Sequence, residues 1–217
     1  MLRKILGIVI ILAVAWVLVS HWSKSVEIKK LKILKEPRIV TMADQRVIEI
    51  EMKGVPADIS GKAISKLIKV YFSLKGIGNS RIVIRARWLK SFTVPQNEQE
   101  AIFAIPIPDT ASRLPKNETK VKINTWEYGE VAEILHIGTY DNEMTDVERL
   151  LRFVKDSGYK IAGLHEEEYI KGPGILLKGN PNKYYTIIRY RVSKNKSKGK
   201  SKNSDINAAH RFGWEKL

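Results

Sequence analysis

The chain has 217 residues, contains no cysteine and carries a formal net charge of +15 at pH 7. The missing cysteine excludes a disulfide framework, a thiolate metal site and a cysteine nucleophile. The positive charge would suit nucleic acid, but much of it is concentrated in a segment near the N-terminus and in a C-terminal tail. We therefore expect no direct DNA binding.

An unbroken apolar run, ILGIVIILAVAWVLV, occupies residues 5–19. With its flanks it approaches the roughly 20 residues that cross a bilayer, and it has no polar face. No small-x-small cleavage site follows it, so we predict an uncleaved N-terminal transmembrane anchor over residues 1–22, which contacts the lipid bilayer through residues 5–22. The protein would then be a single-pass protein of the cell membrane. A cleaved signal peptide is the alternative, and basic residues on both sides of the run leave the orientation open.

The composition divides the rest of the chain into three parts. Residues 23–35 read as a basic linker, and residues 36–192 are long enough for one compact domain with its own core. Residues 193–217 begin SKNKSKGKSKN and contain few apolar residues. This composition predicts a disordered basic tail.

Hydrophobic periodicity predicts four elements in the first half of the domain. In chain order they are a strand at 45–53, a helix at about 58–75, a strand at 81–89 and a strand at 100–107. The helix has an apolar stripe at i, i+3, i+4 and i+7, made by Ile64, Leu67, Ile68 and Tyr71.

The second half repeats this order. It predicts a strand at 131–137, a helix at about 144–157 and a strand at 159–170. The second helix has the same apolar spacing, made by Val147, Leu150, Leu151 and Val154. The sequence therefore predicts an α+β fold, a tandem βαββ repeat over about 36–110 and 119–192, with two helices on antiparallel sheets and a central groove.

Three consecutive carboxylates, Glu166, Glu167 and Glu168, precede Tyr169 in the last of these strands. Successive strand side chains point to opposite faces, so Glu167 and Tyr169 share one face while Glu166 and Glu168 share the other. One interpretation is an edge strand protected by charge. The other is a carboxylate and a phenol that line an aromatic-walled cleft.

Four segments carry a resemblance to a known family: KGVPADISGKAISKLIKVY, EAIFAIPI, HIGTY and EEEYI. In this order and spacing, over roughly residues 26–192, the chain resembles the GyrI-like small-molecule-binding domain of gyrase-inhibitory proteins and of some AraC-type and MerR-type regulators. The resemblance implies a pseudo-twofold pair of βαββ units whose groove holds lipophilic, often cationic compounds. The family's Glu-x-Tyr falls on Glu167 and Tyr169, and its Gly-x-Tyr falls on Gly138 and Tyr140. Some relatives look like hydrolases that use a glutamate and a tyrosine.

The periodicity and the resemblance together predict six ligand-binding residues: Glu167, Tyr169, Tyr140, Trp126, Trp88 and His136. A carboxylate in a partly dry aromatic cleft selects a cation through charge pairing and cation–π contact. Desolvation can also make it a general acid or base, and Glu167 and Tyr140 are then the catalytic candidates. Three functions stay open: a membrane-anchored module that binds a small lipophilic ligand, a small hydrolase of lipophilic or electrophilic compounds, and a protein–protein inhibitor.

The four histidines, at positions 21, 136, 165 and 210, have no metal-binding spacing such as HExxH. The sequence therefore predicts neither a metal nor a cofactor. For His136 and His165 a hydrogen-bonded structural role is the simplest expectation.

Overall fold

The structure is a computed structural model that describes residues 31–78, 82–91, 93–172 and 180–195. The predicted anchor and most of the predicted tail lie outside these residues. Within them, no helix is long and apolar enough to cross a membrane. The chain separates into two units, Met1–Glu36 and Pro37–Leu217. The described end of the first unit contains a 3₁₀ turn at Lys32–Lys35.

The second unit is built on antiparallel strands and two α-helices. The strands are β1 (Arg38–Met42), β2 (Gln45–Lys53), β3 (Ile84–Trp88), β4 (Glu100–Pro106), β5 (Lys122–Trp126), β6 (Gly129–Ile137), β7 (Tyr159–Ile161), β8 (His165–Lys171) and β9 (Tyr185–Lys194). The helices are α2 (Pro56–Ser73) and α3 (Met144–Asp156), and short 3₁₀ turns lie at Gln96–Glu98 (η2), Tyr140–Asn142 (η3) and Pro181–Lys183 (η4). The α+β class predicted from the sequence is confirmed.

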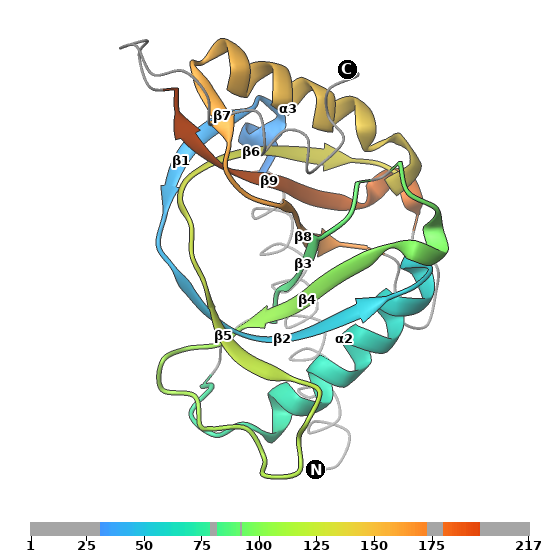
Figure 1. The fold of residues 1–217 in the computed structure, drawn as a ribbon, viewed down its shortest axis with the longest axis vertical. Helices are drawn as coiled ribbons and strands as arrows, with labels where there is room; N and C mark the ends of the chain where they lie inside the picture. The colour runs from blue at the N-terminus through green and yellow to red at the C-terminus, as the bar shows by residue number, and fades with distance from the viewer. Residues whose placement is uncertain (1–30, 79–81, 92, 173–179, 196–217) are drawn as a thin grey trace, which may run out of the picture. The chain divides into compact units, whose positions relative to one another are not determined.

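The strand order is the same in both halves of the sheet. It runs β1-β6-β9-β8-β3-β4-β2-β5, and β7 pairs with β9 off this path. In the second half the central strand is β9, which pairs with β6 on one side and with β8 on the other. In the first half β4 has the same central place, between β2 and β3. The halves meet where β8 pairs with β3, and the outer strands are exchanged, since β1 pairs with β6 and β5 with β2. Figure 1 shows this curled sheet with its two helices.

Both helices cover one face of the sheet. The register places Ala86, Glu167 and Ile188 side by side on neighbouring strands, so these three side chains share a face. Ala86 belongs to the core under α2, and Ile188 to the core under α3. We call this side the helix face. The other side, to which Arg87, Glu166 and Arg189 belong by the same register, is called the arginine face.

The apolar stripes of the helices form most of this core. On α3 three of the four residues of the predicted stripe, Val147, Leu150 and Val154, are buried, and Leu151 is half-buried. On α2 the stripe is shifted, and the buried residues are Ile59, Ala63, Leu67, Val70 and Tyr71. Ile64 and Ile68 are only half-buried. Over the 18 residues of α2 the buried side of the helix follows the 3.6-residue period, and this period passes through Ala63 and Val70 in place of Ile64 and Ile68.

The strand predicted at 159–170 is interrupted. Ile161 pairs with Val192 and Glu166 with Arg189, so this strand has two more residues between the pairs than β9 has. The extra residues bulge out around Gly163, where a Cβ atom would lie 2.8 Å from the Cβ of Arg191. Any residue other than glycine at position 163 would therefore clash with the Arg191 side chain.

Two expectations about the C-terminal part of the domain need correction. The edge-strand interpretation is wrong, because β8 lies in the middle of the sheet between β9 and β3. The tail predicted from residue 193 begins later, since β9 continues to Lys194 through its pairing with Tyr159.

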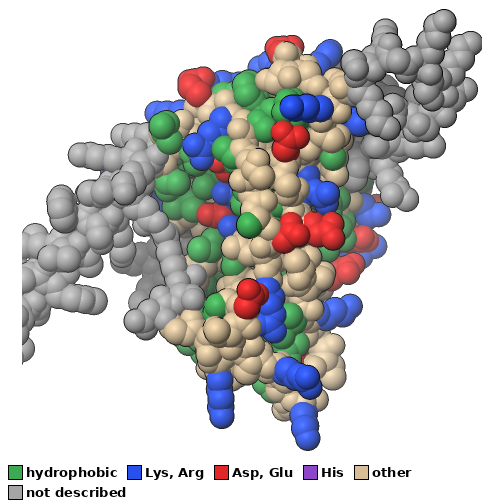
Figure 2. Space-filling view, turned by 90° about the vertical axis from the view of Figure 1, so that its left-hand side faces the viewer, with side chains coloured by type: hydrophobic (Ala, Val, Ile, Leu, Met, Phe, Trp, Pro, Cys, Tyr) green, Lys and Arg blue, Asp and Glu red, His purple; other side chains and the backbone are tan. Residues whose placement is uncertain are grey.

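Figure 2 shows one side of the molecule, on which basic and acidic side chains lie interspersed with hydrophobic ones. A nucleic-acid-binding surface normally gathers lysines and arginines on one face. The expectation of no direct DNA binding stays a prediction.

Candidate functional site

Two carboxylates and a histidine meet in the interior on the helix face. Glu167 of β8 is 5% exposed, and its Oε1 lies 3.1 Å from Nε2 of His165. Glu143, the residue before α3, is 7% exposed and places its Oε1 3.6 Å from the same nitrogen. We call these three residues the acid cluster. Strand alternation brings His165 and Glu167 to one face, and the turn that starts α3 brings Glu143 to them.

The electrostatics of the acid cluster favour a charged histidine. Burial alone would lower the pKa of His165, but Tyr190, Glu143 and Glu167 raise it well above its ordinary value. The Tyr190 hydroxyl lies 2.8 Å from Nδ1 and fixes the ring. Burial raises the pKa of Glu143, and the neighbouring Glu167 raises it further. The raised pKa of Glu143 favours its protonated form, which relieves the surplus negative charge that two ionised carboxyls beside one imidazolium would create.

Aromatic rings lead from the surface to the acid cluster. Tyr140 in η3 is 42% exposed, and its ring centroid lies 6.2 Å from that of Tyr169 and 5.9 Å from that of Tyr184. Burial, Glu167 and Glu143 raise the pKa of Tyr140 to about 12. Burial and Glu167 also raise the pKa of Tyr169 well above its ordinary value. Both phenols are therefore neutral at physiological pH and can donate a hydrogen bond.

His136 lies on the helix face but is fully engaged in local contacts. Its Nδ1 lies 2.8 Å from Oδ2 of Asp146, and its Nε2 lies 2.9 Å from the carbonyl oxygen of Thr139. Burial alone would lower the pKa of His136, but these two partners raise it. Because Thr139 precedes η3 and Asp146 lies in α3, His136 positions the turn that carries Tyr140 and Glu143.

The two predicted tryptophans lie on opposite faces of the sheet. Trp88 is on the helix face as the cross-strand partner of His165, and its buried Nε1 has no hydrogen-bond partner among the described residues. Trp126 is on the arginine face, where its Nε1 donates to Glu49 and the guanidinium of Arg87 lies 3.9 Å from its ring. The expectation that Trp126 lines the same site as Glu167 is therefore corrected. Trp126 ends β5, a strand that the sequence did not predict, so no period was available by which its face could be chosen.

Sequence reasoning missed three residues that the structure brings to this site: Glu143, His165 and Tyr184. His165 could have been found, because strand alternation places it on the face of Glu167. Glu143 and Tyr184 lie just outside a helix and a strand, where no periodicity assigns a direction to the side chain.

The acid cluster is also the described group best placed to hold a metal ion. Its three possible ligand atoms all lie within 4.8 Å of one another. They come from a strand and a helix start, so no short motif in the sequence could reveal them. A metal would have to displace the proton on Nε2 of His165, and the raised pKa of that ring opposes this at neutral pH.

A pH-dependent stability is expected from His165. Its folded-state pKa is raised, so its stabilising effect is complete below its ordinary pKa of about 6.5 and is lost as the pH rises through the folded value. The free energy of unfolding, measured with urea from pH 6 to pH 9, should therefore fall with increasing pH. The fall should be smaller in His165→Gln. His136→Gln should reduce the fall in unfolding free energy by a smaller amount. If the unfolding free energy falls equally steeply with pH in the wild type and in His165→Gln, His165 is not the source of the pH dependence.

A curled antiparallel sheet of two similar halves, with two helices and a buried acid cluster on one face, defines an α+β domain with a pseudo-repeated architecture. The chain belongs to the family described as the GyrI-like small molecule binding domain, which matches residues 35–192. No curated protein matches the sequence.

Solved structures share the fold at low sequence identity. An uncharacterized conserved protein from Listeria innocua is 19% identical with a TM-score of 0.63, over 73% of this chain and 93% of that one. A hydrolase from the same organism is 18% identical with a TM-score of 0.61, over 73% and 92%. The C-terminal domain of EcmrR is 17% identical with a TM-score of 0.57, over 74% and 98%. At these identities the likeness establishes the fold alone.

Proposed function

We propose that this protein binds a small lipophilic cation at the acid cluster, beneath the rings of Tyr140, Tyr169 and Tyr184. One observation carries the proposal: two carboxylates are buried within 4.8 Å of each other and share a single imidazolium. Burying a surplus negative charge costs free energy, which the free protein avoids through the raised pKa of Glu143 and which a bound cation would compensate in the complex. A ligand with a delocalised positive charge supplies that cation at low desolvation cost.

The tyrosines give the ligand's apolar part a surface. Tyr140 is half-exposed while Glu143 and Glu167 are buried, so a ligand reaches an aromatic ring before it reaches the acids. Ring faces attract cations in addition to their hydrophobic contact. The family description, a small-molecule-binding domain, agrees with this type of ligand site.

Glu167→Gln is expected to weaken binding of tetraphenylphosphonium, a lipophilic cation, by about 1.5–3 kcal/mol, the usual contribution of a charge-assisted contact. Isothermal titration of the full-length protein measures this directly. Tetraphenylborate has the same shape and the opposite charge, so it should bind more weakly than the cation to the wild type and should not lose affinity in the variant.

The matched control is Asp141→Asn, which removes the same charge from an exposed residue beside Tyr140. It should leave the affinity for tetraphenylphosphonium within about twofold. Equal losses in Asp141→Asn and Glu167→Gln would mean that general surface charge attracts the cation and that the acid cluster does not bind it.

A hydrolase is the second candidate, and the protonation of the acid cluster favours it. Glu143 has a raised pKa and lies beside a carboxylate and an imidazolium, an arrangement that can donate and accept protons. Turnover of a lipophilic ester such as p-nitrophenyl butyrate should then fall about 100-fold to 10,000-fold in Glu167→Gln while the ester still binds. Turnover unchanged by this substitution would exclude the acid cluster as the catalytic site.

We also propose that residues 5–22 anchor the protein in the cell membrane, an inference that rests on the sequence alone. Mass spectrometry of the purified protein tests it. An intact N-terminus supports the anchor, whereas a mature N-terminus near residue 21 or 22 contradicts it.

A further inference from the structure

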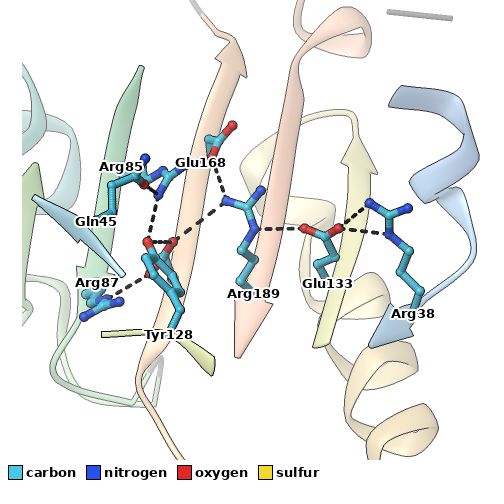
Figure 3. Close-up of polar contacts among 9 residues, drawn as sticks. Arg38, Gln45, Arg85, Arg87, Tyr128, Glu133, Glu168 and Arg189 are labelled. Atoms are coloured by element: carbon cyan, nitrogen blue, oxygen red, sulfur yellow. Dashed lines mark hydrogen bonds and ion pairs between the residues drawn. The ribbon is translucent and has the colours of Figure 1, made fainter. Parts of the chain in front are cut away.

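The arginine face carries a chain of ion pairs that crosses the sheet and is largely buried except at Arg38 (Figure 3). Four arginines alternate with three glutamates: Arg38 with Glu133 at 2.7 Å, Glu133 with Arg189 at 2.9 Å, Arg189 with Glu168 at 2.6 Å, Glu168 with Arg85 at 2.7 Å, and Glu166 with Arg87 at 2.9 Å. The Tyr128 hydroxyl connects the pair of Glu166 and Arg87 to the other ion pairs, because it donates a hydrogen bond to Glu166 and accepts one from Arg85. Each charge is therefore fixed in place by neighbours on adjacent strands.

These groups remain ionised despite their burial. Burial alone would raise the pKa of Glu168, but Arg189 and Arg85 lower it below its ordinary value. Burial alone would lower the pKa of Arg189, but Glu168 and Glu133 raise it. The arginine face thus presents permanent charges at fixed positions.

A cavity of about 140 Å³ adjoins this chain of ion pairs. It is lined by Arg87, Arg189, Arg191, Glu166, Tyr128 and Gly163, among others. The interruption between β7 and β8 contributes Gly163 to its wall. The missing Cβ at that position leaves room for the aliphatic part of Arg191, which reaches the same space.

The charges around the cavity do not balance. Its lining has three guanidinium groups and one carboxylate. Glu166 pairs with Arg87 at 2.9 Å and with Arg189 at 3.8 Å, and Arg189 also pairs with Glu133 and Glu168 beyond the cavity. Arg191 is half-buried and has no acidic partner within the described part of the chain. A positive charge in a partly dry cavity calls for an anion.

We propose that this cavity binds a small oxyanion of the phosphate class, on the face of the sheet opposite the acid cluster. Guanidinium groups pair with tetrahedral or planar oxyanions through two parallel N–H···O bonds, which a halide cannot accept. A volume of about 140 Å³ is well above what a single water needs and leaves space for one phosphate group. Arg191 is the primary ligand, because Arg87 and Arg189 are already paired with glutamates and Arg191 carries the uncompensated charge of the lining.

The test is a titration of the full-length protein with sodium phosphate in a chloride buffer of constant ionic strength, followed by calorimetry and by thermal unfolding. Phosphate should bind and raise the unfolding temperature, whereas added chloride should do neither. Arg191→Gln should weaken phosphate binding about 10-fold or more. Arg152→Gln is the matched control, because it removes the same charge from a side chain of α3 that is 68% exposed, and it should leave binding unchanged.

Phenyl phosphate distinguishes the two sources of this oxyanion. Equal affinity for phenyl phosphate and phosphate would support a phosphorylated molecule whose remainder extends out of the cavity, and selective binding of phosphate would support the free ion. No binding of either, or equal losses in Arg191→Gln and Arg152→Gln, would overturn the proposal. Glu167→Gln should not change phosphate binding, so this proposal and the proposed function can fail separately.

Discussion

Replacing Arg189 by methionine is expected to reduce the free energy of unfolding by about 3–5 kcal/mol, the usual cost of removing one partner from a buried ion pair. Arg189 is 6% exposed, and its loss removes the cation shared by the buried carboxylates of Glu133 and Glu168, each of which then keeps one arginine partner, Arg38 or Arg85. The two acids also lie on the strands that flank β9, so the substitution weakens the sheet at its centre. Urea denaturation of the full-length protein, followed by circular dichroism, measures the change.

Arg152→Met provides the comparison for this substitution. Arg152 lies on α3, and its pairing with Glu148, at 3.9 Å, is exposed to solvent, so its loss should cost at most about 0.5 kcal/mol. If Arg189→Met unfolds at the same urea concentration as Arg152→Met, the ion pairs on the arginine face contribute little to stability. In that case apolar packing around β9 maintains the sheet.

Leu67→Ala and Leu150→Ala should each cost about 2–5 kcal/mol, because each removes a fully buried side chain from the core beneath its helix. Leu67 belongs to the core under α2 and Leu150 to the core under α3. Their places in the two predicted repeats correspond, so the two variants should lose comparable stability. Chemical denaturation of both variants at one pH measures the two losses side by side.

Phe72→Ala is the control for these core substitutions. Phe72 is 68% exposed on α2, so its truncation should change stability by no more than about 0.5 kcal/mol. A wild-type unfolding midpoint in either leucine variant would show that its helix does not stabilise the sheet it covers.

Periodicity predicted the local structure well because the residues that define it are close in the sequence. The two helices, four of the strands and the separation of Glu167 from Glu168 onto opposite faces all follow from spacings of two to four residues. The pairing of β8 with β3 and β9 depends on residues far apart, so nothing near Glu168 showed that its strand is central. Glu168 consequently appears from the sequence to be a simple surface acid, although it pairs with two buried arginines.

The candidate site was predictable in part. Glu167, Tyr169 and Tyr140 were found from strand alternation and from the family resemblance, and the structure brings the three together. Glu143 and the placement of Trp126 could not be predicted, because both lie at the ends of elements where the backbone turns. There the direction of a side chain is set by tertiary contacts such as that between Trp126 and Arg87.

The exchange of outer strands sets an order for folding during synthesis. β1 precedes the first half of the domain but pairs with β6, and the bonded residues Arg38 and Glu133 are 95 positions apart. As the chain leaves the ribosome, β1 emerges long before its partner, and β2 must likewise wait for β5. Closing such long loops before their contacts form is slow, and the first half meanwhile exposes strands that can pair with other nascent chains. β9 lies between β6 and β8 in the sheet, so the two halves complete their sheet as one cooperative unit only after residue 194 has been released.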